Sequence, residues 1–117
     1  MLSFSSKQRY YLYRGPTDMR KSFNGLSGLV HQHFSANLLS GDIFIFLNRR
    51  RDRIKLLKWD VTGFAIYYKR LERGTFELPR LDSQQSSLEL RWSDLVMLLE
   101  GIELNSIRRR KRYERRA

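Results

Sequence analysis

The sequence contains no cysteine, which excludes disulfide bonds, cysteine nucleophiles and cysteine-ligated zinc or iron–sulfur sites. It has no run of about 18 apolar residues, so a membrane-spanning helix is not expected. Residues 1–9 lack the apolar centre of a signal peptide. These absences favour a protein of the reducing cytoplasm, and a length of 117 residues leaves room for one domain.

Patterns that carry catalysis or bind metals are also scarce. His31 and His33 are the only histidines, and a spacing of two places them on different sides of a helix. The carboxylates Asp52, Asp60 and Glu72 are possible metal ligands of a nuclease, but nothing in their spacing forces them together. There is no glycine-rich phosphate loop and no nucleophile motif. We therefore expect no catalytic residue, cofactor or metal, and a small nuclease is the weakest functional alternative.

Positive charge is the dominant property of the chain. Lysine and arginine total 23 against 12 acidic residues, a formal net charge of +11. The excess lies in two segments, residues 49–73 and 107–117, each with a net charge of +6. Most of these cations are arginines, whose planar guanidinium grips phosphate in two places. A basic chain of this kind most often binds nucleic acid.

The hydrophobic pattern predicts an antiparallel sheet with helices. Alternating residues predict strands at 8–14, 42–47, 53–59, 64–70 and 88–91, with a short edge strand at 75–78. Thr17 or Asp18 would cap a helix that ends near residue 33. Its apolar face would comprise Met19, Phe23, Leu26 and Val30, with Phe23 against the sheet. A second helix would begin at Ser93 and end at Gly101.

The fold class that follows is α+β, an antiparallel β meander with two helices packed on one face. Residues 1–104 would form a single α+β domain. Residues 105–117 would form a basic C-terminal tail without a core of its own.

The candidate nucleic-acid contacts lie in the two basic segments. A hairpin tip over residues 48–53 can present its cations to a groove or a phosphate backbone, although a charged turn can also be simply solvated. The tail would bind phosphates without sequence preference. Tyr67 and Tyr68 would either stack on exposed bases or fill the core. The predicted phosphate-binding residues are Arg49, Arg50, Arg51, Arg53, Lys55, Lys69, Arg70 and Arg73 in the first segment and Arg108, Arg109, Arg110, Lys111 and Arg112 in the tail.

Four stretches of the sequence resemble a known family. They are Gly15-Pro16-Thr17-Asp18-Met19-Arg20-Lys21-Ser22-Phe23 with Gly25-Leu26; Asn48-Arg49-Arg50 with Asp52-Arg53-Ile54-Lys55-Leu56-Leu57 and Trp59-Asp60; Gly63-Phe64 with Tyr68-Lys69-Arg70-Leu71-Glu72-Arg73-Gly74 and Phe76; and Leu98-Leu99-Glu100-Gly101-Ile102. Together they resemble the TnpB-type accessory proteins, the second-reading-frame products of bacterial insertion sequences of the sixty-six group. The family commonly has a glycine in the hairpin turn at the position where this chain has Arg51. The arginine adds positive charge to the turn, and its side chain affects which turn type the backbone can adopt.

The resemblance implies participation in transposition beside a separate transposase that carries the catalytic acids, and it implies no catalytic residue here. The main hypothesis is a non-enzymatic accessory protein that binds DNA through the hairpin and tail. The alternative is an interaction module that docks on the transposase of the same element through residues 14–21 and the second helix. The sequence leaves open whether the protein forms homo-oligomers.

Overall fold

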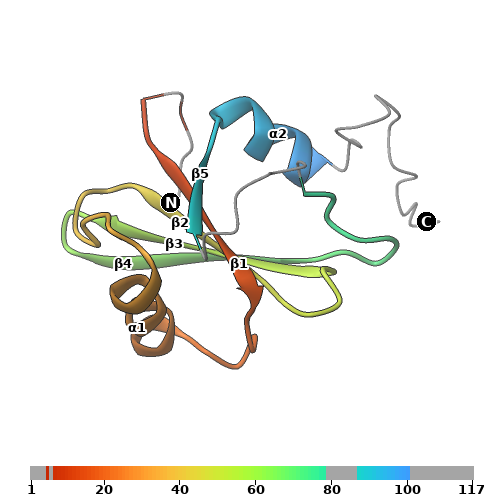
Figure 1. Cartoon of the computed structure of the whole chain (residues 1–117), viewed down its shortest axis with the longest axis horizontal. Helices are drawn as coiled ribbons and strands as arrows, with labels where there is room; N and C mark the ends of the chain where they lie inside the picture. Colours follow the sequence, from red (N-terminus) through yellow and green to blue (C-terminus); the bar gives the residue numbers. More distant parts are fainter. Residues whose placement is uncertain (1–4, 6, 79–86, 101–117) are drawn as a thin grey trace.

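The computed structural model describes residues 5, 7–78 and 87–100. In chain order the elements are β1 (Tyr10–Pro16), α1 (Phe23–His33), β2 (Ile43–Leu47), β3 (Arg53–Asp60), β4 (Gly63–Arg70), β5 (Ser87–Leu90) and α2 (Trp92–Glu100). The strands form one sheet in the order β4-β3-β2-β1-β5 (Figure 1). The α+β class is confirmed, and so is the antiparallel meander of β2, β3 and β4.

The pairing of β1 departs from the all-antiparallel expectation. β1 runs parallel to β2, with Tyr10 opposite Ile43 and Pro16 opposite Leu47. On its other edge β1 pairs antiparallel with β5. The sheet is therefore mixed, and Gly15 and Pro16 end β1 instead of lying beyond it.

The two helices lie on opposite faces of the sheet, which corrects the prediction that both pack on one face (Figure 1). The reason lies in β2, whose five residues are all buried. Ile43, Ile45 and Leu47 enter the core that Leu95 and Leu98 of α2 cover. Phe44 and Phe46 enter the core that Leu26 and Val30 of α1 cover. A strand that is apolar on both faces needs a cover on each.

The start of α1 also differs from the prediction. The helix begins at Phe23, after Ser22, whose side chain makes no capping hydrogen bond, and not near Thr17 or Asp18. Phe23 therefore lies in the first turn and is 45% exposed, so the prediction that it packs on the sheet is wrong. Residues 75–78 form no strand, although Phe76 is buried in the α2-side core.

Candidate nucleic-acid interface

The parallel pairing of β1 and β2 brings two loops of the chain together. Parallel strands end at the same edge of a sheet, so the loop after β1 lies beside the turn after β2. The Thr17 N–H donates to the Leu47 carbonyl at 2.8 Å and joins the two directly. Residues 17–22 therefore lie next to the arginine-rich turn of residues 48–52, although some 30 positions separate them in sequence.

The turn between β2 and β3 is held by the side chain of Asn48. Its Oδ1 accepts hydrogen bonds from the backbone N–H groups of Asp52 at 3.1 Å and Arg53 at 3.0 Å. Its Nδ2 donates to the Asp52 carboxylate at 2.6 Å. That hydrogen bond lowers the pKa of Asp52, so the carboxylate stays ionised at neutral pH. Arg51 has a φ of 57°, in the left-handed region where glycine is usual.

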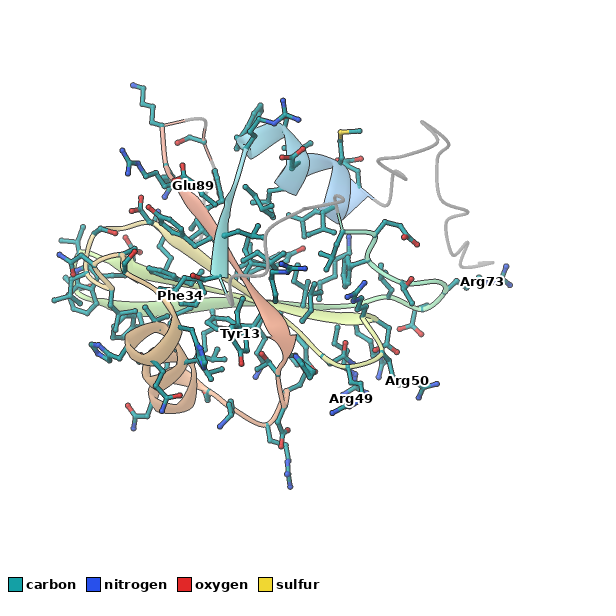
Figure 2. The ribbon with its side chains drawn as sticks, viewed as in Figure 1. Tyr13, Phe34, Arg49, Arg50, Arg73 and Glu89 are labelled. Carbon is teal, nitrogen blue, oxygen red and sulfur yellow. The ribbon has the colours of Figure 1, made fainter. Side chains whose placement is uncertain are left out.

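The turn is also fastened to the segment that follows β4. The Leu71 N–H donates to the Asp52 carbonyl at 2.7 Å, and the Phe76 N–H donates to the Arg51 carbonyl at 2.6 Å. Phe76 is buried, so it anchors this contact in the core. The exposed side chains of Arg49 and Arg50 therefore project from an ordered backbone (Figure 2).

Two adjoining hollows run from this turn across the α1-side face of β3 and β4. The first, of about 510 Å³, and the second, of about 370 Å³, share Arg53 and Tyr68. We call them together the arginine groove. Its lining residues are Thr17, Asp18, Met19, Arg20, Asn48, Arg49, Arg50, Arg53, Tyr68, Arg70 and Glu72. Five arginines and two carboxylates leave the groove with a net positive charge.

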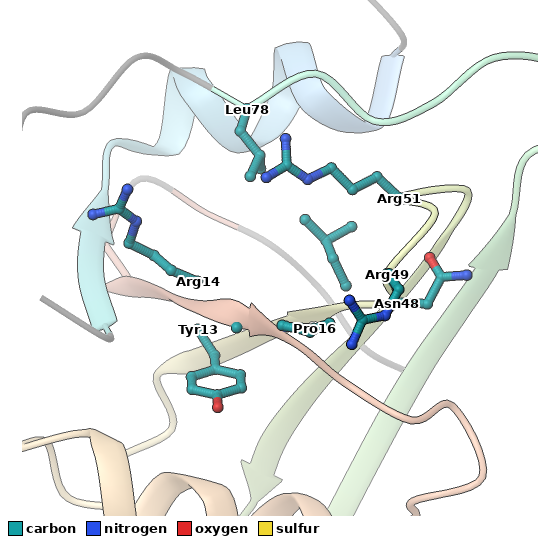
Figure 3. Close-up of a pocket in the computed structure, with 9 residues that line it drawn as sticks. Tyr13, Arg14, Pro16, Asn48, Arg49, Arg51 and Leu78 are labelled. Atoms are coloured by element: carbon teal, nitrogen blue, oxygen red, sulfur yellow. The ribbon is translucent and has the colours of Figure 1, made fainter. Parts of the chain in front are cut away.

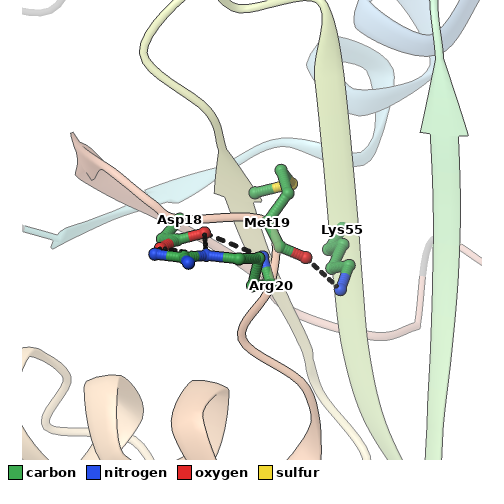
Figure 4. A network of polar contacts seen from close by, with 4 residues as sticks. All are labelled: Asp18, Met19, Arg20 and Lys55. Carbon is green, nitrogen blue, oxygen red and sulfur yellow. Dashed lines mark hydrogen bonds and ion pairs between the residues drawn. The ribbon is translucent and has the colours of Figure 1, made fainter.

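Both carboxylates of the groove pair with arginines. Arg20 donates to Asp18 from Nε and Nη2, the shorter contact being 2.7 Å, and this lowers the pKa of Asp18 to about 2 (Figure 4). Arg70 pairs with Glu72 at 3.1 Å. Arg49, Arg50 and Arg53 make no ion pair within hydrogen-bond distance among the described residues, although the Asp52 carboxylate is close enough to attract Arg50 and Arg53.

A smaller hollow of about 220 Å³ lies on the other side of the turn. Figure 3 shows Arg14 from β1 and Arg49 and Arg51 from the turn around it, with Leu78 at its rim. Arg49 lines both this hollow and the arginine groove. Cations thus flank the turn on two sides.

Lys55 does not belong to this exposed set. Its side chain is buried, and its Nζ donates to the carbonyls of Met19 and Lys21 at 2.8 Å each (Figure 4 shows the first). The ammonium therefore ties the loop of residues 17–22 to the sheet. The structure thus gives Lys55 a structural role, and its role as a phosphate ligand stays a prediction that its burial does not favour.

Lys69 points to the opposite face of the sheet. It lies opposite Ile54, a residue of the α2-side core, and its Nζ donates to the Leu99 carbonyl in the last turn of α2 at 3.0 Å. A cation there satisfies an unpaired helix carbonyl and suits the helix dipole. Lys69 is therefore remote from the groove, and its predicted grouping with the hairpin arginines is not observed.

The remaining predicted contacts fall into separate places. Arg70 lines the groove, whereas Arg73 projects from the loop after β4, away from Arg49 and Arg50 (Figure 2). The tail residues Arg108, Arg109, Arg110, Lys111 and Arg112 lie outside the described residues.

The tyrosine pair at the end of β4 divides between core and surface. Tyr67 packs against the α2-side core, where it has Leu56 as its cross-strand partner. Tyr68 lies on the α1-side face, is 48% exposed and lines the arginine groove. Core packing is therefore observed for Tyr67, whereas base stacking stays a prediction for the exposed Tyr68.

Sequence reasoning missed Arg14, Arg20 and Thr17 as neighbours of the turn. Arg14 and Arg20 belong to the stretch that the sequence assigned to the alternative, protein-docking surface. Only the parallel register of β1 on β2 reveals that they share one end of the molecule with the hairpin. Thr17 Oγ1 is buried and has no hydrogen-bond partner among the described residues.

The described part of the chain contains no group of three or more His, Asp or Glu side chains able to hold a metal ion. His33 instead packs its ring against Tyr13, with centroids 4.7 Å apart. No helix within residues 7–78 and 87–100 is long and apolar enough to cross a membrane.

Comparison with known proteins supports the resemblance found in the sequence. Residues 8–109 match the family model described as IS66 Orf2 like protein. The chain belongs to this family. IS66 denotes a group of insertion sequences, so membership confirms the expected relationship to TnpB-type proteins and associates the chain with transposition.

Two relatives from Sinorhizobium fredii (strain NBRC 101917 / NGR234) extend over nearly the whole chain. The relative named "Uncharacterized protein y4jC" is 30% identical to this chain over 110 residues, which are 94% of this chain and 92% of the relative. "Uncharacterized protein y4hO" is 31% identical over 103 residues, 88% of each chain. No solved structure matches the chain significantly.

Proposed function

We propose that this IS66 Orf2-like protein is a non-enzymatic accessory factor of transposition that binds DNA, with the arginine groove and its turn as the main contact surface. Its partners would be the DNA of the element ends and the transposase of the same element. The basic tail of residues 105–117 would add affinity that does not depend on sequence.

The convergence of arginines from four segments is the observation that carries the proposal. Arg20 comes from the loop after β1, Arg49 and Arg50 from the turn, Arg53 from β3 and Arg70 from β4. A solvated hairpin would spread such charges apart to reduce their repulsion. Here the fold gathers them around one hollow, an arrangement that a polyanion would stabilise.

The rigidity of the turn adds to the argument. The Asn48 hydrogen bonds and the Phe76 anchor fix the backbone of Arg49, Arg50 and Arg51 before any ligand arrives. Less conformational freedom is then lost on binding. Guanidinium groups on such a backbone suit the paired oxygens of a phosphodiester.

A salt titration of duplex binding tests the proposal. Counterion release predicts a log–log slope of about −0.9 for each phosphate contacted. The double variant Arg49→Ala, Arg50→Ala should therefore reduce the magnitude of the slope by about 2. The matched control is Lys7→Ala with Arg9→Ala, which removes the same charge near the opposite end of β1 and should leave the slope nearly unchanged.

The alternative, docking on the transposase without specific DNA contact, predicts a different result. Capture of the purified transposase would then persist in nuclease-treated samples, and the arginine variant would bind duplex like the control. A flat salt dependence, or no binding to duplex at low salt, would reject the DNA-binding function.

A further inference from the structure

An exposed aromatic ring, that of Tyr68, lines the arginine groove. Tyr68 and Arg53 are the two residues that both hollows of the groove share. Nearly half of the Tyr68 surface is exposed. A ring face is not needed for phosphate binding, which guanidinium groups supply by themselves, so the exposed ring offers the groove a second kind of contact.

Two cationic side chains contact Tyr68, Lys55 over a face of the ring and Arg53 at its hydroxyl. Lys55 is the cross-strand neighbour of Tyr68, and its Nζ lies 4.8 Å from the ring centroid. The same ammonium is bonded to two backbone carbonyls, so it cannot move with the ring. Arg53 Nη1 donates to the Tyr68 hydroxyl at 3.4 Å. The cation–π contact lies over one face of the ring, and Tyr68 still keeps nearly half of its surface exposed where it lines the groove.

These contacts give the ring the properties of a stacking platform. An aromatic face in a positively charged groove is the combination that single-stranded nucleic acids bind, with bases on the ring and phosphates on the cations. Duplex DNA does not offer its base faces in this way, since they are stacked inside the helix.

We propose that the arginine groove binds single-stranded DNA by stacking an unpaired base on Tyr68, with Arg49, Arg50 and Arg53 on the neighbouring phosphates. The inference rests on the proposed DNA-binding function and deepens it, because it assigns the groove to unpaired strands such as those exposed when an element end is opened. Tyr68 is the residue that distinguishes base stacking from phosphate binding.

The experiment compares a labelled oligodeoxythymidylate with a blunt duplex of equal length, by fluorescence anisotropy of the full chain at one salt concentration. The single strand should bind several-fold more tightly. Tyr68→Leu, which keeps apolar bulk but removes the ring, should weaken single-strand binding by about 5- to 150-fold, the range for loss of one stacked base. Tyr68→Phe keeps the ring and should bind within about threefold of the parent.

Two controls keep the test specific. Trp92→Leu removes an exposed aromatic ring from α2, on the other side of the sheet, and should not change either affinity. Duplex affinity of Tyr68→Leu should stay within about twofold of the parent, because the arginines remain. Thermal melting of each variant verifies that an exposed substitution leaves the fold intact.

The outcomes separate this inference from the proposed function. Salt-sensitive duplex binding with no effect of Tyr68→Leu would reject stacking and leave the phosphate-binding function standing. Tighter binding of an oligouridylate than of the thymidylate would overturn the assignment to DNA. Failure of every nucleic acid to bind at low salt would overturn both proposals and assign the ring to a protein partner.

Discussion

Arg51 occupies a backbone conformation that costs an L-residue about 1–2 kcal/mol. Its φ of 57° is one that glycine adopts freely. Arg51→Gly should therefore raise the free energy of unfolding by up to about 1 kcal/mol, since the greater freedom of glycine in the unfolded chain offsets part of the gain. Urea denaturation measures the change.

The matched control for this variant is Arg50→Gly. Arg50 is also an exposed arginine of the turn but does not have a positive φ. Its replacement should cost about 0.5–1 kcal/mol, because only the flexibility of glycine remains. Equal losses for the two variants would show that Arg51 is not strained.

The pKa of the Asp18 carboxyl group depends on its contacts within the loop after β1. The hydrogen bonds from Arg20 lower the pKa of Asp18 to about 2, below its usual 3.8. The stability from this pair is therefore present above about pH 4 and is lost as the pH falls toward 2. Arg20→Gln should move the pKa of Asp18 back toward 3.8, as measured by NMR titration of its carboxyl carbon. A pKa that stays near 2 would assign the shift to another cause.

At the scale of elements, Lys55 links β3 to the loop that precedes α1. Lys55→Met would leave the Met19 and Lys21 carbonyls without their donor, and a fully buried unsatisfied group costs about 1–3 kcal/mol. Because both bonds are only partly buried and methionine restores some apolar packing, we expect a net loss of about 1–2 kcal/mol in urea denaturation. Lys58→Met, on the same strand but half-buried, should change stability by less than about 0.5 kcal/mol. Equal losses would contradict the structural role of Lys55.

The elements differ in how far the sequence alone specifies them. The meander of β2, β3 and β4 was predictable because short turns join neighbouring strands and their alternation is local. The start of α1 was not predictable from the sequence. Met19 continues the helical spacing of Phe23, Leu26 and Val30, but the helix begins only at Phe23 and Met19 lies in the loop before it. Met19 does pack against the α1-side core, but from the loop.

The candidate site shows the same division. The turn arginines stood out in the sequence because they are adjacent, and the structure places them together on an exposed turn. The groove was not predictable, because it depends on the parallel register of β1 and β2. The alternation of β3 places Lys55 and Arg53 on one face, but burial of Lys55 follows from the packing of a distant loop.

At the scale of the whole molecule, residues 49–73, which include the ordered turn, and residues 107–117 each carry a net charge of +6. Each residue that must be fully fixed on contact costs about 1–2 kcal/mol, so a tail without a core of its own, as the sequence predicts, would give diffuse attraction. Arg50→Ala with Arg51→Ala should weaken any preference for element ends over random duplex. Deletion of residues 107–117 should lower affinity for both duplexes by similar factors.

Competition binding at one fixed salt concentration distinguishes these roles. The ratio of the two affinities is the quantity to compare, because both variants lower total charge. If the deletion abolishes the preference while the turn variant keeps it, the roles of turn and tail are reversed.

The place of β1 between β2 and the late strand β5 has a consequence for folding during synthesis on the ribosome. Tyr10 is made near the start, but its partner Leu90 emerges some 80 residues later, and Leu95 and Leu98 later still. At about 5–20 residues per second, the apolar face that includes Ile45 and Leu56 waits roughly 2–8 seconds after Leu56 is made before Leu98 can cover it. A product that stops before residue 87 would keep that face bare beside an unpaired edge of β1. Premature termination should therefore yield aggregates instead of a smaller DNA-binding protein.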